Sequence, residues 1–214
     1  MSWDHVWIIL SGVPWTLAVT GLSMLVGIVL GFPLMFARNS QNVILSTLMV
    51  MVIALVRGVP PIVWLFIVFF GIGTGLVQID PFTAAIIVFG VIAATNMAEI
   101  YRGGMIAIHA GQHEAATALN FGRWHAFWDI VLPQMLRVAL PATTTYAIGL
   151  LKDSAIASTI GVLELAYQGR YVTEMTYQGL PVLAIVGAIY IVISIPIAIF
   201  ARHADAQMRR RVAR

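Results

Sequence analysis

Five charged side chains interrupt long apolar stretches of the sequence: Arg57, Glu99, Arg102, Lys152 and Asp153. A charge inside a bilayer costs about 2.5 kcal/mol or more, so each is expected to pair, to face a bundle interior or to line an aqueous path. A guanidinium can hold a carboxylate by paired hydrogen bonds, and a carboxylate can hold an ammonium group. These residue types therefore indicate a path for a small zwitterion rather than a reaction centre.

We expect Arg57 to hold the carboxylate of such a solute, and Glu99 or Asp153 to hold its ammonium group. Asn96 lies one helical turn before Glu99 on the same face and belongs to the same candidate set. Two alternatives stay open. Arg57 would cap helix ends without touching solute, and Glu99 would form a structural ion pair with Arg102 three residues on.

No catalytic group and no metal site is predicted. The chain has no cysteine, and its five histidines lie near expected helix ends or loops. His109 and His113 are four residues apart but lack a third ligand. The only lysine is Lys152, and no glycine-rich phosphate loop is present, so the chain itself holds no nucleotide. We therefore predict that the protein is not an enzyme and has no cofactor of its own.

The composition places the chain in a membrane. Hydrophobic residues make up 60% of it and charged residues 10%, against roughly half and a quarter in soluble domains. At about 20 residues for each crossing, the predicted fold is all-α, a single integral membrane domain of residues 1–214 with about five transmembrane helices. The expected spans are 13–36, 43–72, 82–105, 138–162 and 181–201, with a polar loop at 108–134.

The N-terminal residues 1–11 carry Trp3 and Trp7 at helical spacing and are expected to lie at the membrane interface as an aromatic anchor. A cleaved signal peptide is not expected, because this segment has no lysine or arginine and the apolar run after it is too long. Three glycines in the first span would permit close helix contact: Gly21, Gly27 and Gly31.

Two spans are expected to be broken. In the second, Pro60 and Pro61 follow Arg57 and remove two backbone donors, so the freed peptide groups must be satisfied inside protein or by water. In the fourth, Lys152 and Asp153 interrupt the apolar run, and because they are adjacent they cannot face each other on a helix. Residues 71–81 are expected to be a loop, and 164–179 a polar loop with room for a short helix.

The polar segment from Glu114 to Gln134 is expected to form a helix, a turn and a second helix. Asn120 is a residue type that tolerates positive φ and would end the first helix. Pro133 would break or kink the second. One face of the second helix is expected to be buried, namely Trp124, Phe127, Trp128 and Val131. The first presents a small-residue surface to a partner at Ala115, Ala116 and Ala118.

Charge asymmetry predicts the orientation. With five spans and a cytoplasmic polar segment, the N-terminus lies outside and the C-terminus inside. The basic residues then gather in the cytoplasm, as the positive-inside rule requires, and Arg170 alone lies outside. The cytoplasmic set is Arg38, Arg123, Arg137, Arg202, Arg209, Arg210, Arg211 and Arg214.

The polar segment resembles the EAA loop of ABC importer permeases, in which Glu-Ala-Ala is followed after three residues by Gly and after nine more by Ile, one residue and Leu-Pro. The single departure is Asn120 in the glycine position. The resemblance implies a type I importer permease fold and a coupling helix that seats in a cytoplasmic ATPase. The matching residues are Glu114, Ala115, Ala116, Ile130, Leu132 and Pro133, and the implied coupling residues are Glu114, Ala115, Ala116, Leu119, Asn120, Phe121 and Gly122.

Other stretches are similar to motifs of the polar amino acid branch of these permeases. Arg57 to Pro60 resembles its Arg-Gly-Thr-Pro, with Val59 in place of threonine, and Lys152 to Ile156 resembles its Lys-Asp-Thr-Ser-Leu, with one hydroxyl lost. Glu99 to Gly104 also matches this branch. Pro60 thereby joins the candidate pathway residues.

The resemblance covers nearly the whole chain and implies a bacterial inner-membrane subunit that imports polar amino acids or related zwitterions by alternating access. Its implied partners are two ATPase subunits that bind ATP and Mg²⁺, a second permease, identical or homologous, and an extracytoplasmic solute-binding protein, with no nucleic acid. The alternatives are a secondary transporter, which usually shows internal repeats, an ABC permease for a different small solute, and a membrane enzyme or structural protein, which would leave the polar segment unexplained.

Overall fold

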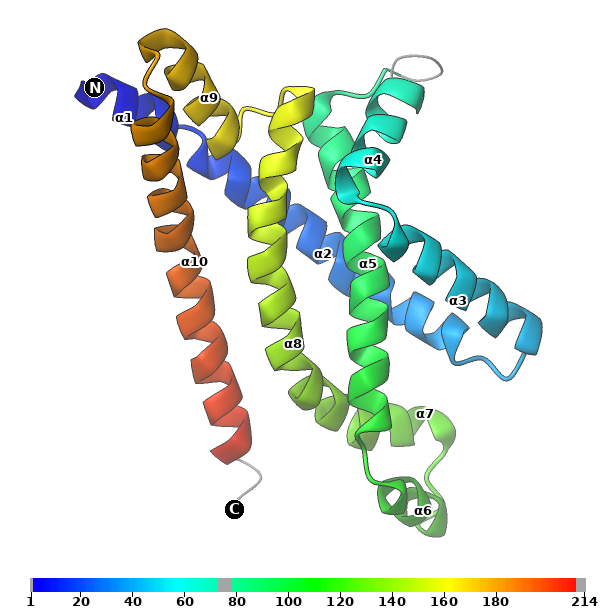
Figure 1. The fold of residues 1–214 in the computed structure, drawn as a ribbon. Coiled ribbons are helices and arrows are strands. Elements are labelled where there is room, and N and C mark those ends of the chain that lie inside the picture. Colours follow the sequence, from blue (N-terminus) through cyan, green and yellow to red (C-terminus); the bar gives the residue numbers. More distant parts are fainter. Residues whose placement is uncertain (1, 73–77, 211–214) are drawn as a thin grey trace.

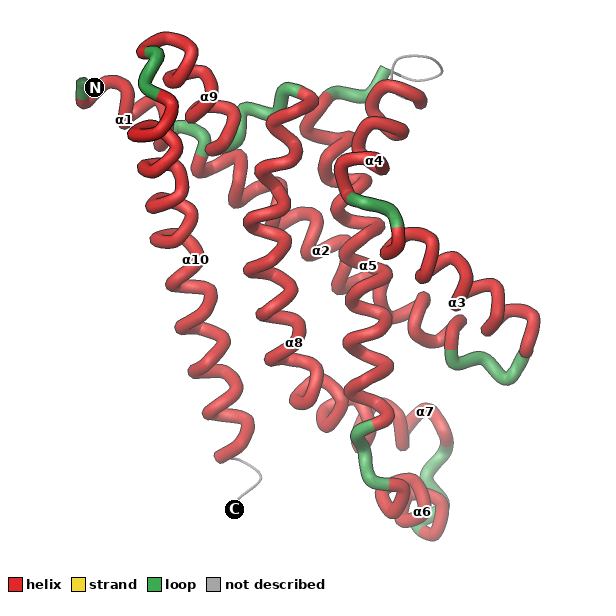
Figure 2. The backbone as a smooth tube through the Cα atoms, in the orientation of Figure 1, coloured by secondary structure: helices red, strands yellow, loops and turns green. Residues whose placement is uncertain are grey.

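The computed structural model describes residues 2–72 and 78–210, and these residues form helices joined by loops (Figure 2). Part of the expected loop at 71–81 lies outside the described residues, and so does the end of the basic tail from Arg211. In chain order the helices are α1 (Trp3–Leu10), α2 (Val13–Arg38), α3 (Val43–Gly58), α4 (Pro61–Phe66), η1 (Ile67–Ile72), α5 (Pro81–Ile106), α6 (Ala110–Ala118), α7 (Arg123–His125), η2 (Ala126–Val131), α8 (Leu132–Asp153), η3 (Ser154–Ile160), α9 (Leu165–Thr176) and α10 (Gly179–Arg210).

Within the described residues, three helical segments are long and apolar enough to cross a membrane: Trp3–Arg38, Pro81–Ile106 and Gly179–Phe200. Two bent pairs, α3 with α4 and η1, and α7 to η3 with α9, raise the number to five if each pair is one span. The all-α expectation with about five spans therefore holds. Helices α1 and α9 lie at one end of the molecule, and α6 and the C-terminal end of α10 lie at the other (Figure 1).

Among the described helices, α2 and α5 share the most extensive contact, and small residues permit their approach. A Cβ atom at Gly27 would lie 2.5 Å from the Cβ of Ala93, and one at Gly31 would lie 2.7 Å from the Cβ of Met97. The expected close contact is confirmed at these two glycines. Gly21 makes no such contact within the chain, since a Cβ there would meet nothing within 4 Å and Gly21 lies on the exposed side of α2.

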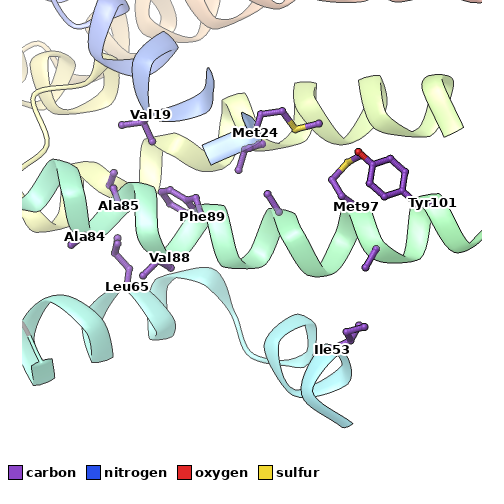
Figure 3. Close-up of a cluster of buried hydrophobic side chains, with 14 of the residues drawn as sticks. Val19, Met24, Ile53, Leu65, Ala84, Ala85, Val88, Phe89, Met97 and Tyr101 are labelled. Carbon is purple, nitrogen blue, oxygen red and sulfur yellow. The ribbon is translucent and has the colours of Figure 1, made fainter. Parts of the chain in front are cut away.

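The main hydrophobic cluster is built around α5. Phe89 at its centre is 1% exposed, and Leu65 of α4 is fully buried and lies toward Ala84, Ala85 and Val88 (Figure 3). Side chains from α2, α3, α8 and η3 complete this cluster. A second, smaller cluster joins α1, α9 and α10 through Ile9, Leu165, Val172, Val182 and Val186. The chain thus has two separate apolar packing centres.

The second span bends by 96° between α3 and α4. Helix α3 ends at Gly58, and α4 begins at Pro61, where a missing backbone donor is harmless because the first turn has no partner for it. The indole Nε1 of Trp64 donates to the carbonyl oxygen of Val56 at 3.1 Å, which satisfies a group freed at the break. The bend follows from Pro60 and Pro61, as their backbone chemistry predicts.

The helix that contains the fourth expected span begins before residue 138. The helical segment runs from Arg123 to Ile160, so Pro133 neither ends nor separates it. Pro133 lies in the first turn of α8, directly after the π-helical turn η2. The wider π-helical turn changes the hydrogen-bond pattern just where proline would remove a donor. The polar segment after residue 164 also proves more regular than expected, since α9 has 12 residues.

Candidate functional site

Helix α6 is held at both ends by local hydrogen bonds. The Nδ1 atom of His109 accepts from the backbone N–H of Gly111 at 3.1 Å and caps the helix start. At the other end Asn120 has φ 57°, and the N–H of Phe121 donates to the carbonyl of Ala116 at 2.9 Å. The left-handed cap expected at Asn120 is confirmed, so asparagine fulfils the backbone role of the glycine in the EAA pattern.

The outer surface of α6 and its turn is largely exposed. The described side chains of Glu114 and Ala115 are exposed, Leu119 is 70% exposed and Phe121 is 43% exposed. Asn120 and Gly122 are exposed beside them. A ridge with two small residues and two apolar residues suits insertion into a groove of another protein. We call this surface the α6 ridge: Glu114, Ala115, Leu119, Asn120, Phe121 and Gly122.

Ala116 does not belong to the exposed small-residue surface that the sequence predicted. Its side chain is only 4% exposed and lines a cavity of about 280 Å³ together with Phe127 and Val131. Helix α6 therefore rests on η2 through Ala116, whereas Ala115 and Ala118 face outward. In the single chain, Ala116 braces the ridge and does not form part of it.

The prediction that Trp124, Phe127, Trp128 and Val131 form one buried face in the polar segment is also wrong in part. Val131 is 5% exposed and Phe127 is half-buried against Phe36, but Trp124 is 68% exposed and Trp128 is 53% exposed. The expectation assumed 3.6 residues for each turn, whereas Ala126–Val131 is π-helical. The longer repeat rotates the two tryptophans away from the face that holds Val131.

A charged triad ties the end of α2 to the end of α5. Glu99 accepts from the Nε of Arg38, and its Oε2 accepts from the Nη2 of Arg102 at 3.0 Å. Among the described residues these are the ion pairs with the least exposed side chains, 17% for Glu99 and 21% for Arg38. The structural ion pair left open for Glu99 and Arg102 is thus the arrangement found, enlarged by Arg38. Since two guanidinium groups occupy the Glu99 carboxylate, Asp153 remains as the acidic candidate for solute.

Replacement of Glu99 by glutamine is expected to leave two facing guanidinium groups without their counter-charge. We expect the free energy of unfolding of the purified protein to fall by about 1–3 kcal/mol, the usual cost of leaving a partly buried charged group without its partner. The KM for solute is expected to stay unchanged. Glu174→Gln is the matched control, because Glu174 is 70% exposed and 3.9 Å from Arg170, and such pairs contribute little. A raised KM with unaltered stability would return Glu99 to the solute path.

Three candidate pathway residues, Arg57, Asn96 and Asp153, lie within electrostatic range of Tyr146, which the sequence reasoning missed. The hydroxyl of Tyr146, on α8, lies near the side chain of Asn96 on α5 and within electrostatic range of Arg57 and Asp153. The Nδ2 of Asn96 also donates to the carbonyl of Ile92 at 2.8 Å. A tyrosine within an apolar span was the available signal.

The charges of this cluster are not enclosed by the chain itself. Arg57, Lys152 and Asp153 are exposed, as is Pro60 at the α3–α4 bend. Charged side chains on membrane helices face protein or water rather than lipid, because lipid exposure is costly. Together with Asn96 and Tyr146, Arg57 and Asp153 therefore mark a polar surface that another subunit or an aqueous cavity must cover. Among the described residues, no group of three or more metal-ligating side chains occurs.

Known proteins resemble the chain over nearly its whole length. The family model for "Binding-protein-dependent transport system inner membrane component" matches residues 23–210. The glutamine transport system permease protein GlnP of Escherichia coli (strain K12) is 29% identical over 214 residues, which cover 97% of this chain and 98% of that protein. The L-cystine transport system permease protein TcyL of Bacillus subtilis (strain 168) is 34% identical over 221 residues, covering 100% and 92%.

A solved structure agrees with these relatives. The crystal structure of an amino acid ABC transporter with histidines superposes with a TM-score of 0.88 at 27% identity, over 95% of both chains. The type I importer permease fold expected from the EAA pattern is confirmed by this match. The polar α6 segment, the apolar helices and the family match agree, and the chain belongs to the family of binding-protein-dependent transport system inner membrane components, the multi-pass permease subunits of ABC importers.

Proposed function

We propose that this chain is the permease subunit of an ATP-driven importer for polar amino acids or related small zwitterions. The relatives support the solute class, since the named proteins serve glutamine and L-cystine transport. The cluster around Tyr146 supports it chemically. Arg57 supplies a cation for a carboxylate, and Asp153 supplies an anion for an ammonium group.

The exposed charges support a second permease as the partner that completes the path. Arg57, Lys152 and Asp153 lie uncovered in the single chain, and two copies or two homologous permeases that faced each other would enclose them. The solute path then runs between the two subunits, with Asn96 and Tyr146 on its wall. An extracytoplasmic solute-binding protein delivers the solute, as the family description implies.

The α6 ridge is the surface that would receive force from an ATPase subunit, which itself binds ATP and Mg²⁺. Short caps at His109 and Asn120 hold α6 as a rigid body, and Ala116 joins it to η2 and thus to α8. A displacement of the ridge is thereby passed to the span that carries Tyr146 and Asp153. The cytoplasmic orientation of α6 and of the C-terminus is supported by the basic residues, which concentrate in segments at that end of the molecule (Figure 1).

A transport assay with solutes of different charge tests the solute path. In proteoliposomes that hold the chain with its co-purified subunits, Arg57→Gln and Asp153→Asn are each expected to raise the KM about tenfold, the effect of one lost charge-assisted hydrogen bond. The probes are L-glutamine, L-cystine and L-histidine, with maltose as a solute that carries no charge.

Asp4→Asn serves as the control, since Asp4 is exposed on α1, a helix that contributes no residue to the cluster. Uptake of maltose in place of the amino acids would assign a different solute class. An unchanged KM in both pathway variants would remove Arg57 and Asp153 from the solute site.

A further inference from the structure

A cavity of about 170 Å³ lies between the bend of the second span and α5. Val56 of α3 and Trp64 of α4 line one side of it, and Ile87, Val88 and Val91 of α5 line the other. Val88 is 3% exposed and lies on the side of α5 that faces α4 (Figure 3). The cavity is therefore bounded by both halves of the broken span and by the central helix of the main hydrophobic cluster.

The wall of this cavity is apolar. Its described side chains are aliphatic except for that of Trp64, whose Nε1 already donates to the carbonyl oxygen of Val56 at 3.1 Å. In other proteins an apolar cavity of about 150 Å³ stays dry and takes up a hydrocarbon such as benzene. Water or a zwitterionic solute would lose hydrogen bonds on entering such a space. The lining thus selects a hydrocarbon ligand.

The cavity opens away from the polar cluster around Tyr146. Its exposed lining residues are Ile87 and Val91, which are 42% and 43% exposed. Asn96, the member of the polar cluster on α5, follows Ile87 by nine positions. At 3.6 residues for each turn, nine positions place the two side chains on opposite faces of the helix. The opening is thereby separated from the polar surface that a second permease or an aqueous cavity would cover.

The cavity also lies at the depth of hydrocarbon. Helix α5 is long and apolar enough to cross a membrane, and the lining residues Ile87 to Ile92 lie roughly 9–17 Å along it from Pro81, at 1.5 Å for each residue. The hydrocarbon core of a bilayer is about 30 Å thick. An acyl chain, and not a lipid headgroup, is what the bilayer presents at this level.

We propose that the cavity is a binding site for one acyl chain of a membrane phospholipid, which fills the space that the 96° bend leaves between α4 and α5. An unfilled cavity would leave Trp64 and Val88 without packing partners on one side, so the bound chain stabilises the bend. This inference goes beyond the proposed function. It needs the membrane location of the chain and does not depend on which solute is carried.

Photocrosslinking tests the site. The assembled complex is placed in vesicles of phosphatidylethanolamine and phosphatidylglycerol that carry a diazirine midway along one acyl chain, and the labelled peptides are mapped by mass spectrometry after illumination. Adducts on residues 87–92 are expected to be about fivefold more frequent than adducts around Ile191, because a chain held in a cavity stays in contact while bulk lipid exchanges. Ile191 is the reference because it is 63% exposed on α10.

Filling the cavity should remove the excess. Val91→Phe and Ile87→Phe each place a ring at its open side and are expected to lower the adducts on α4 and α5 to the level seen around Ile191. Ile191→Phe is the matched control and is expected to leave them unchanged. Equal labelling of α5 and α10 in the wild-type protein, or labelling of α5 that both filling variants leave intact, would overturn the proposal.

A second copy of the permease is the competing occupant, and a cysteine separates it from lipid. Because the chain has no cysteine, Val91→Cys introduces a single thiol at the opening of the cavity. Under mild oxidation with copper phenanthroline we expect this variant to stay monomeric on a non-reducing gel. A disulfide-linked dimer would show that another permease covers the cavity and would rule out the acyl chain.

Discussion

Arginine in place of Ala115 is expected to reduce solute uptake by about a hundredfold, the largest functional effect of any single replacement described here. Ala115 is an exposed small residue at the centre of the α6 ridge. A long cation there would have to be buried without a partner when the ridge enters the groove of an ATPase subunit, which costs several kcal/mol. The measurement is uptake by proteoliposomes, together with the amount of ATPase that co-purifies with the tagged chain.

Gln41→Arg is the matched control, because it adds the same side chain to the exposed loop between α2 and α3. Both variants are expected to insert and to show the same thermal unfolding, since neither changed residue is buried. Normal uptake and normal ATPase recovery for Ala115→Arg would mean that the ridge does not meet the ATPase, and the proposed coupling would have to be abandoned.

Leucine in place of Gly27 is expected to prevent stable folding. Even a single Cβ there would approach the Cβ of Ala93 to 2.5 Å, and the rest of the side chain would enter the backbone of α5. Overpacking of a close contact costs about 1–3 kcal/mol and more where backbones must separate. Because the main hydrophobic cluster is built on α2 and α5, we expect loss of monodisperse protein on size-exclusion chromatography.

The same replacement at Gly21 is the matched control, since a Cβ at that position meets nothing within 4 Å. Gly21→Leu is expected to purify like the wild-type protein and to unfold at the same temperature. Equal yields of the two leucine variants would show that the α2–α5 approach is not required for the fold.

The features that sequence reasoning predicted well are those set by local chemistry. Proline at 60 and 61 dictates a bend whatever surrounds it, and Asn120 suits one backbone conformation that few other residue types tolerate. Glu99 and Arg102 are neighbours on any helix. These predictions needed no knowledge of how the helices pack.

The features that sequence reasoning missed depend on which helices pack against each other. Arg38 is 61 residues from Glu99 in the chain, and no local pattern pairs them. Glu164 falls in the predicted polar loop 164–179, whereas in the structure it is buried and accepts hydrogen bonds from Thr16 and Tyr190, which lie 148 and 26 positions away in the chain. The exposure of Trp124 and Trp128 depends on a π-helical turn that has no clear sequence signature.

The division of the apolar side chains into two clusters bears on how such a subunit changes shape. The cluster around α5 and the cluster between α1, α9 and α10 are built from different buried side chains, and α10 also packs along α8 of the first cluster. Glu164 accepts hydrogen bonds from Thr16 of α2 and Tyr190 of α10, and so links a helix of the first cluster to a helix of the second. A movement of one cluster relative to the other would turn about this point, because its hydrogen bonds fix α2, α9 and α10 at one place.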